Sequence, residues 1–271
     1  MNSEKEKKNA SGIVYSCYYQ RSREGEHFVA EHVLSYQISG FLVLSDGTRD
    51  YPSEQGSIRF VKRNQLLKFV KQPPANGEFK SLSIYLSQQI LKDFSREYHI
   101  QAAHKEYDRP ISTITTSPLL KSFMDSLLLY HNADSLKNPD LIDLKIKELL
   151  ILLLQADPEL KNVLFDFNEP HKMDLEAFMN KNYHFNVHLE RFAYLTGRSL
   201  ASFKRDFEKA FGQTPGKWLQ HKRLQEAYYL ISSKGRTASD VYLDLGFEDL
   251  SHFSFAFKKQ FGISPTKIAS I

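Results

Sequence analysis

Basic and hydroxyl side chains gather around two stretches in the C-terminal third of the chain, "FKRDFEKAFGQTP" (203–215) and "FSFAFKKQFGISP" (253–265). Arginine can form paired hydrogen bonds with a guanine edge, while lysine and hydroxyl groups suit phosphates and bases. In a helix these side chains would lie opposite a stripe of phenylalanines, where they could contact double-stranded DNA. The candidates are Ala201, Ser202, Lys204, Arg205 and Lys209 for the first stretch, and Leu250, Ser251, Ser254, Phe255, Lys258 and Lys259 for the second.

The phenylalanine stripes define the helices that must carry these side chains. Phe203, Phe207 and Phe211 stand four residues apart, so they share one helix face that we expect to be buried. The "GQTP" that follows predicts a left-handed helix end at the glycine and a new helix capped by the threonine. The same pattern returns 50 residues later, beginning at Phe253. Such a repeat indicates two copies of one supersecondary unit.

Each stripe is preceded by a shorter helical segment and a turn that contains glycine. The first helices are expected over residues 189–196 and 238–245, with Gly197 and Gly246 in the turns. Two short helices joined by a tight turn form a helix-turn-helix, whose second helix can lie in the DNA major groove. Any one basic residue here would be typical of a solvated surface. Because the frame occurs twice, we interpret the basic residues as DNA contacts.

The region from about Met173 to Ile271 resembles the DNA-binding domain of AraC/XylS-type bacterial transcription regulators. The family implies two helix-turn-helix units joined by one long helix (215–232), with recognition helices in successive major-groove segments. It also implies RNA polymerase as a partner, an activating role, and an upstream cupin-like β-barrel for effector binding or dimerisation. The resemblance rests on Leu195-Thr-Gly197, Phe203-x3-Phe207-x3-Phe211-Gly212-x-Thr214-Pro215, Arg223-x3-Ala227, Gly246-Phe247 and Phe253-x3-Phe257-Lys258-Lys259-x-Phe261-Gly262-x-Ser264-Pro265.

Two positions depart from the family pattern in the second unit. Tyr242 stands where a small residue is usual in the first helix, so its surroundings must repack. Phe255 stands where a polar or basic base-reading residue is frequent on the recognition helix. Phenylalanine can touch a thymine methyl group but cannot donate a hydrogen bond. We therefore expect the first unit to carry most of the base readout.

The first 168 residues are expected to form a separate domain. Residues 1–10 have the composition of a disordered tail, and residues 11–86 hold short segments rich in β-branched and aromatic residues, separated by turn signals. Helical periodicity follows over residues 87–168. The predicted domains are thus 11–168 and 170–271. The fold class is α+β: a small antiparallel, cupin-like β-barrel with following helices, then an all-α domain of two helix-turn-helix units.

The segment "LIDLKIKELLILLLQ" (141–155) predicts a helix that is apolar over most of its circumference. Such a helix must be covered, either by its own domain or by a second copy of the chain. If it forms a homodimer interface, glutamate at Leu149 and Leu153 should give a soluble monomer. Insoluble or unfolded protein would instead favour a helix in the core of its own domain.

An effector of the first domain could be a small molecule or a protein. Five aromatic residues are candidates for an effector pocket, although they would suit a barrel core equally well: Tyr36, Phe41, Phe60, Phe69 and Tyr85. Metal-binding cupins use clustered histidine and glutamate, but Glu26-His27 and Glu31-His32 match no metal-ligand pattern. No metal or other cofactor is predicted. The alternative to a DNA-binding regulator is a metal-dependent cupin enzyme fused to a DNA-binding module.

Composition and charge agree with this division of the chain. With 41% hydrophobic and 25% charged residues the composition is that of an ordinary globular protein. The longest apolar run (149–154) is too short to span a bilayer, and the single cysteine, Cys17, fits a reducing cytoplasm. Residues 1–169 carry 21 Lys/Arg and 22 Asp/Glu, whereas residues 170–271 carry 15 and 10. The net positive charge therefore lies where DNA binding is predicted.

Overall fold

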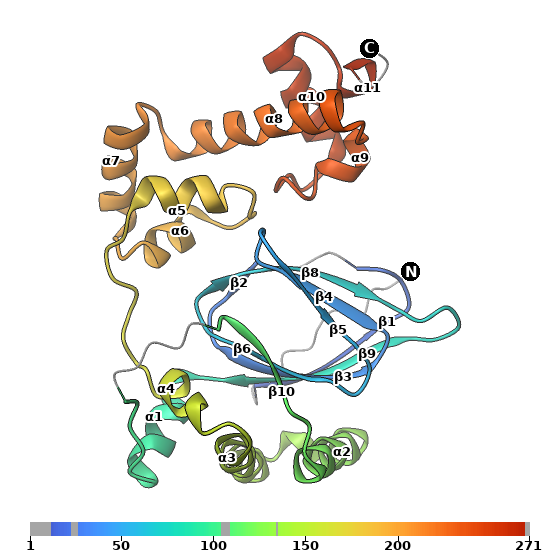
Figure 1. The fold of residues 1–271 in the computed structure, drawn as a ribbon, viewed down its shortest axis with the longest axis vertical. Coiled ribbons are helices and arrows are strands. Elements are labelled where there is room, and N and C mark those ends of the chain that lie inside the picture. The colour runs from blue at the N-terminus through green and yellow to red at the C-terminus, as the bar shows by residue number, and fades with distance from the viewer. Residues whose placement is uncertain (1–11, 23–26, 104–108, 134, 269–271) are drawn as a thin grey trace. The chain divides into compact units, whose positions relative to one another are not determined.

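A computed structural model describes residues 12–22, 27–103, 109–133 and 135–268. The chain divides into two compact units, one formed mainly by residues 29–168 and the other mainly by residues 169–271 (Figure 1). The tail predicted at residues 1–10 and the metal-ligand candidate Glu26 lie outside the described residues.

The first unit begins with a set of short strands. The strands are β1 (Ile13–Tyr18), β2 (Phe28–Val29), β3 (His32–Ser39), β4 (Phe41–Ser45), β5 (Asp50–Ser53), β6 (Ile58–Val61), β7 (Gln65–Leu66), β8 (Lys68–Gln72), β9 (Phe79–Leu86) and β10 (Ile111–Ile114). The larger sheet has the order β1-β9-β3-β6-β10, a three-stranded sheet has the order β5-β4-β8, and β2 pairs with β7. The five-stranded and three-stranded sheets are antiparallel throughout. The prediction of an antiparallel β-domain is confirmed.

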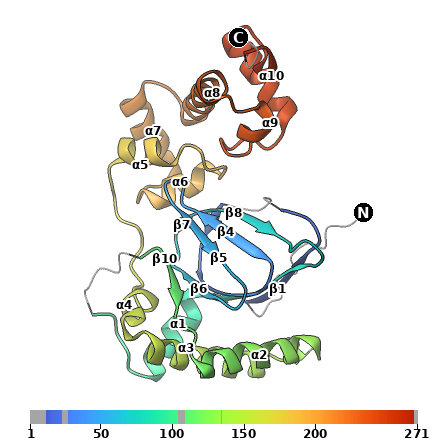
Figure 2. The ribbon, with the colours of Figure 1, turned by 45° about the vertical axis from the view of Figure 1, so that its right-hand side comes forward.

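The helices that follow pack on one face of the larger sheet. They are α1 (Gln88–Glu97), α2 (Pro118–Asn132), α3 (Pro139–Ala156) and α4 (Lys161–Leu164), with 3-10 turns at Ser135–Lys137 and Pro158–Leu160. The side chains of Ser87, Ser117 and Asn138 cap the first turns of α1, α2 and α3. In Figures 1 and 2, α2 and α3 lie along one side of the larger sheet, and the three-stranded sheet lies on the other.

Side-chain alternation divides the larger sheet into two faces. Leu34 and Phe60 pair in register and join the core that packs against the helices. Ser35 and Arg59, the neighbouring register pair, therefore point to the opposite face, called here the inner face. The inner face is turned toward the three-stranded sheet. Its apolar cluster contains Val33, Val61, Leu67 and Ile111, against which Leu44 and Tyr51 of the three-stranded sheet pack.

One strand falls within the stretch predicted to be helical. β10 pairs antiparallel with β6 and completes the larger sheet, so the prediction of helices throughout 87–168 is wrong at this point. Its four residues, "ISTI", are rich in β-branched side chains, which favour a strand. A segment this short shows too little periodicity to be recognised inside a helical region.

The apolar helix predicted at 141–155 is α3, and its own domain covers one side of it. Leu149 and Leu153 are fully buried in the core shared with α2 and the larger sheet. These two positions therefore cannot report on a dimer interface, because a charge there would disrupt the domain itself. Leu144 and Ile151 lie on a different side of the helix, where they are 64% and 37% exposed.

From residue 169 onward, the described residues of the second unit contain helices and turns but no strand, as predicted. Its helices are α5 (Leu175–Asn182), α6 (Leu189–Leu195), α7 (Leu200–Phe211), α8 (Pro215–Lys234), α9 (Ala238–Val241), α10 (Leu250–Phe261) and α11 (Pro265–Ile268). The helix predicted at 238–245 is shorter than expected, since the chain leaves it after Val241 and continues as turns to Gly246. In the described parts of the chain, no helix is both long enough and apolar enough to cross a membrane.

Candidate nucleic-acid interface

A capping side chain and two glycines determine where the first candidate recognition helix, α7, begins and ends. Ser199 Oγ accepts a hydrogen bond from the Ser202 N–H (3.2 Å) at its start, and Gly212 (φ 67°) ends it. The turn before it holds Gly197 at φ 64°, where an added Cβ would lie 2.4 Å from the carbonyl carbon of His171. Only glycine fits this turn, which fixes the position of α7 relative to α6.

The phenylalanine stripe of α7 forms the core of the first helix-turn-helix. Phe203 and Phe207 are fully buried, as predicted. Phe211 is only partly buried, so the prediction of a completely buried stripe is wrong at its last residue. It ends the helix beside the exposed Gly212, and its ring packs on Trp218 of α8 with the centroids 4.6 Å apart.

The second helix-turn-helix repeats this construction around α10. Asp249 Oδ1 accepts a hydrogen bond from the His252 N–H (2.6 Å), and Gly262 (φ 74°) ends the helix. Phe253 and Phe257 are buried in a core that α9 and α8 complete, while the last residue of the stripe, Phe261, is again only partly buried. Tyr242, where the family usually has a small residue, is half-buried and packs against this core.

A half-buried arginine connects α8 to the rest of the second unit. Arg223 donates hydrogen bonds to the carbonyls of Tyr183 (2.7 Å), Phe185 (2.8 Å) and Gly246 (2.9 Å). Burial lowers the pKa of Arg223 to about 10, so the guanidinium stays protonated at neutral pH. The motif match singled out Arg223 without a role. Its partners are backbone atoms distant in sequence, which no side-chain pattern could reveal.

The predicted contact residues lie on the solvent side of both recognition helices. Ser202 and Ser254 are half-buried, and Phe255 is 68% exposed although it is apolar. The other exposed members are Ala201, Lys204, Arg205 and Lys209 on α7, and Leu250, Ser251, Lys258 and Lys259 on α10. Each helix thus buries the first two phenylalanines of its stripe and presents the predicted residues on the other side.

Arg205 takes part in a small surface charge network. Its Nη2 lies 3.4 Å from Asp206 Oδ1, and Arg198 Nε lies 3.2 Å from the other oxygen of the same carboxylate. Hydrogen bonding from Arg198 is the main cause that lowers the pKa of Asp206. The Arg205 side chain is 76% exposed, and an exposed ion pair of this kind contributes little. Arg205 can therefore exchange this contact for a base at low cost.

One exposed side chain of the second helix was missed. His252 lies on α10 beside Ser251 and is exposed, with its ring 6.3 Å from that of Phe247. In the 50-residue repeat, His252 is the equivalent of Ser202, which the sequence did identify. Applying the repeat position by position would therefore have added His252 to the candidates.

Two family models match the chain. The model of the ExsA N-terminal regulatory domain matches residues 32–163, and a helix-turn-helix domain model matches residues 192–270. The chain belongs to the AraC family of transcription regulators. The relatives of this chain regulate transcription and are not enzymes, so the alternative of a metal-dependent cupin enzyme is set aside.

Two relatives align with the AraC-family chain over nearly its whole length. The transcriptional regulator ExsA of Pseudomonas aeruginosa is 28% identical and covers 94% of this chain and 91% of its own. The virulence regulon transcriptional activator VirF of Yersinia enterocolitica is 24% identical, with 93% and 92% covered. A crystal structure of ToxT from Vibrio cholerae aligns over 97% of this chain and 98% of ToxT, at 11% identity and a TM-score of 0.45. A score this low supports no detailed comparison.

The five aromatic residues predicted for an effector pocket of the regulatory domain are not brought together. Tyr36 and Phe60 belong to the core between the larger sheet and the helices. Tyr85 packs instead with the apolar cluster of the inner face, and Phe69 pairs with Leu44, which packs there too. Phe41 alternates with Leu44 along β4, so its side chain points to the outer face of the three-stranded sheet, where it is 37% exposed. Only Phe69 and Tyr85 face the region between the two sheets.

The metal-ligand candidates form no cluster in the part of the chain that the structure describes. Nowhere in that part do three His, Cys, Asp or Glu side chains come close enough to hold a metal ion. His32 is fully buried, stacks on Phe60 with the ring centroids 5.5 Å apart, and accepts a hydrogen bond at Nδ1 from the Arg63 N–H (3.1 Å).

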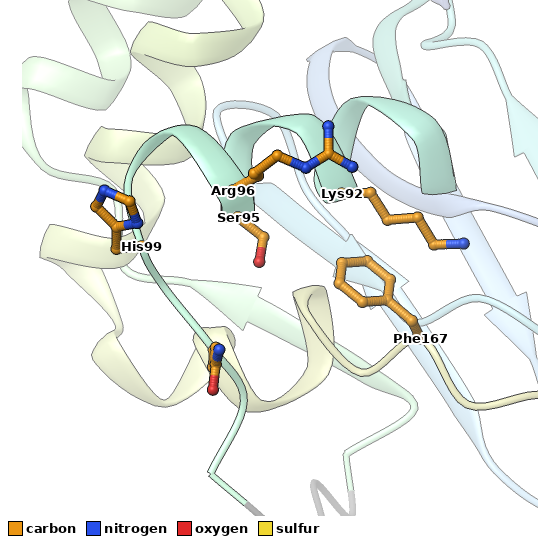
Figure 3. A pocket seen from close by; sticks show the side chains of 6 residues that line it. Lys92, Ser95, Arg96, His99 and Phe167 are labelled. Atoms are coloured by element: carbon orange, nitrogen blue, oxygen red, sulfur yellow. The ribbon is translucent and has the colours of Figure 1, made fainter.

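A hollow of about 540 Å³ lies on the surface of the regulatory domain beside α1 (Figure 3). It is lined by Lys92, Ser95, Arg96, His99, Gln101 and Phe167. Lys92 Nζ lies 5.6 Å from the centre of the Phe167 ring, and Arg96 pairs with Asp93. Its charged side chains are exposed, so they contribute little to holding a ligand.

Proposed function

We propose that the chain activates transcription in the cytoplasm by placing α7 and α10 in successive major-groove segments of a promoter. The observation that supports this most directly is the presence of two capped helices, each with basic and hydroxyl residues opposite its buried phenylalanines. α8, which connects them, has 20 residues and is therefore about 30 Å long. That length is close to the ~34 Å between successive major-groove segments on one side of DNA.

The individual side chains have distinct roles in this proposal. Arg205 reads a guanine through paired hydrogen bonds, and Phe255 contacts a thymine methyl group. Lys204, Lys258 and Lys259 neutralise phosphates, which fixes the position of the helices without specifying sequence. RNA polymerase is the partner that an activator would contact, and the name of VirF as an activator supports this sign of regulation.

Selection of binding sites from random DNA by the full chain tests this proposal. We expect enriched sequences with two half-sites about 10 base pairs apart, the spacing of successive major-groove segments. The half-site read by α7 should be the more sharply defined one. Absence of any enriched sequence would contradict sequence-specific binding, and a single half-site would contradict the use of both helices.

The regulatory domain is proposed to dimerise and to respond to an effector, either a small molecule or a protein. For the dimer, the support is the exposed pair Leu144 and Ile151 on α3, which lie on one side of the helix within the predicted segment 141–155. If the exposed sides of α3 from two copies packed together, they would cover apolar side chains that the single domain leaves in water. For the effector, the support is the inner face of the larger sheet, where Arg59 lies buried beside serine hydroxyls.

A further inference from the structure

Arg59, on β6 of the larger sheet, is a buried basic residue with no ion-pair partner among the residues that the structure describes. The residue is 2% exposed, and its Nη1 is buried without a hydrogen-bond partner. Within the described parts of the chain it takes part in no ion pair. Burial lowers its pKa to about 10, so the side chain is still protonated at neutral pH. An uncompensated buried charge is unfavourable and calls for an explanation.

Two other arginines of the described residues, the buried Arg63 and the half-buried Arg223, are different. Arg63 Nη2 donates to the carbonyls of Asp166 (3.1 Å) and Asn168 (2.6 Å). Arg223 donates to three carbonyls in the second unit. Both Arg63 and Arg223 therefore have carbonyl acceptors, whereas Arg59 Nη1 has none.

The strand register places polar side chains around Arg59 on the inner face. Arg59 pairs with Ser35 on β3 and with Thr113 on β10, and Ser35 pairs with Ser83 on β9. The hydroxyls of Ser35 and Ser83 lie 3.1 Å apart. These residues form one row across the sheet, and the row beside it contains the apolar Val33, Val61 and Ile111.

No acid is available on these strands to neutralise Arg59. The one acidic residue within the described strands is Asp50 of β5, which is exposed. It is the neighbour of the inward-facing Tyr51, so its side chain points to the outer face of the three-stranded sheet. The facing sheet instead contributes Lys71, which shares a face with Leu42 and lies 3.2 Å from the Tyr18 hydroxyl. The inner face therefore holds the arginine in a polar row, with an apolar row beside it.

We propose that Arg59 is the anchor of a site on the inner face that binds a small carboxylate with a short apolar body. A carboxylate matches the single charge and planar fork of a guanidinium and can accept two parallel hydrogen bonds from it. The serine hydroxyls of the same row can donate to its oxygens, and the neighbouring apolar row suits the rest of the ligand. The inference deepens the effector role proposed for the regulatory domain and rests on it.

Melting of the dialysed full chain tests whether Arg59 is held for a ligand. Replacing an unpaired buried charge by an apolar side chain of similar length should stabilise the empty protein, so Arg59→Met should raise Tm by about 2–4 °C. The matched control is Arg63→Met, which leaves the carbonyls of Asp166 and Asn168 without their donor and should lower Tm. A fall in Tm for Arg59→Met would overturn the proposal, because it would show that the charge supports the fold.

Ligand binding is tested with hexanoate and benzoate, and with hexanamide and benzamide as uncharged counterparts. We expect at least one carboxylate to raise the Tm of the wild-type chain by about 2–4 °C at saturating concentration, while its amide does not. Neither carboxylate should shift Arg59→Met. Equal shifts by acid and amide, equal shifts in wild type and variant, or no shift with either carboxylate would each overturn the proposal. No DNA is present, so this result is separate from the outcome of the binding-site selection.

Discussion

Arg205 and Phe255 occupy equivalent positions in the two copies of the repeat, 50 residues apart. Both are exposed near the middle of their recognition helices, at 76% for the Arg205 side chain and 68% for Phe255. The local frames agree in caps, glycine ends and buried phenylalanines. The difference in readout between the two units should therefore come from the side chains presented and not from the position of the helices.

Replacing Arg205 should relax the preference for one or two base pairs. A paired contact with guanine is worth about 1–3 kcal/mol of discrimination, so Arg205→Ala should lose about that much on the best site and little on non-specific DNA. Phe255→Ala should change the selected sequence less. Lys258→Ala serves as the control, since loss of a phosphate contact should weaken binding about equally on all sequences. A more sharply defined second half-site would reverse this assignment.

His32 should make the regulatory domain less stable in mild acid. Burial, assisted by Arg63 and Lys62, lowers the pKa of His32 to about 3. Above pH 6.5 the ring is neutral in both states. Between pH 6.5 and 3 only the unfolded chain takes up the proton, so the free energy of unfolding falls by roughly 1.4 kcal/mol per pH unit.

Urea unfolding at pH 7.5 and 5.5 measures this dependence. His32→Asn retains an acceptor for the Arg63 N–H but cannot titrate, so the loss of stability between the two pH values should be about 1.4 kcal/mol smaller than in wild type. The same pH dependence in both proteins would show that other groups cause it.

The helical elements of the second unit could be predicted because their boundaries are encoded locally. Gly212, Gly235 and Gly262 end their helices in the left-handed conformation, and Ser199 and Asp249 begin theirs with side-chain caps. The elements that were missed depend on distant partners. β10 is a strand because β6 lies beside it, and the row that contains Arg59 is defined by the register of four strands. No pattern within one segment carries that information.

The turn before α7 provides a test of how tightly an element is fixed. Gly197 and Gly212 have similar positive φ values (64° and 67°), but only Gly197 would place a Cβ against backbone, at 2.4 Å from His171. Alanine at Gly212 should cost about 1 kcal/mol for conformation alone. Gly197→Ala should cost about 1–3 kcal/mol more, because residues 171–172 must move. Equal costs in urea unfolding would show that this segment yields easily.

The exposed side of α3 provides a second test at this scale. If it forms the dimer interface, Leu144→Glu with Ile151→Glu should give a folded monomer, because both side chains lie outside the domain core. Sedimentation measures the mass, and circular dichroism checks the fold. Met173→Glu, at an apolar position of the second unit that is as exposed as Ile151, is the control and should leave the dimer intact. A dimer that persists in the double variant would place the interface elsewhere.

At the scale of the whole molecule, the two units divide structure and charge between them. The first unit has its core between the larger sheet and its helices, and the second has a core built around Phe253, Phe257 and α8. Residues 170–271 hold an excess of five positive charges, and the remainder holds one negative charge in excess. The core around Phe253 and Phe257 contains only residues of the second unit, and the excess of positive charge lies in the same part of the chain.

A fragment of residues 170–271 should therefore fold and bind duplex DNA by itself. If it neutralises six or more phosphates, its affinity should fall by about 10³-fold or more between 50 and 200 mM salt, because each neutralised phosphate releases condensed counterions. The full chain should lose affinity with salt about as steeply as the fragment, counted per DNA-binding domain bound, since the first unit has no excess of positive charge. Titrating both proteins against one selected duplex at several salt concentrations gives the two slopes directly. Tight binding with a flat salt response would contradict the interface proposed on α7 and α10, and a fragment that fails to fold would show that the second unit needs contacts beyond its own core.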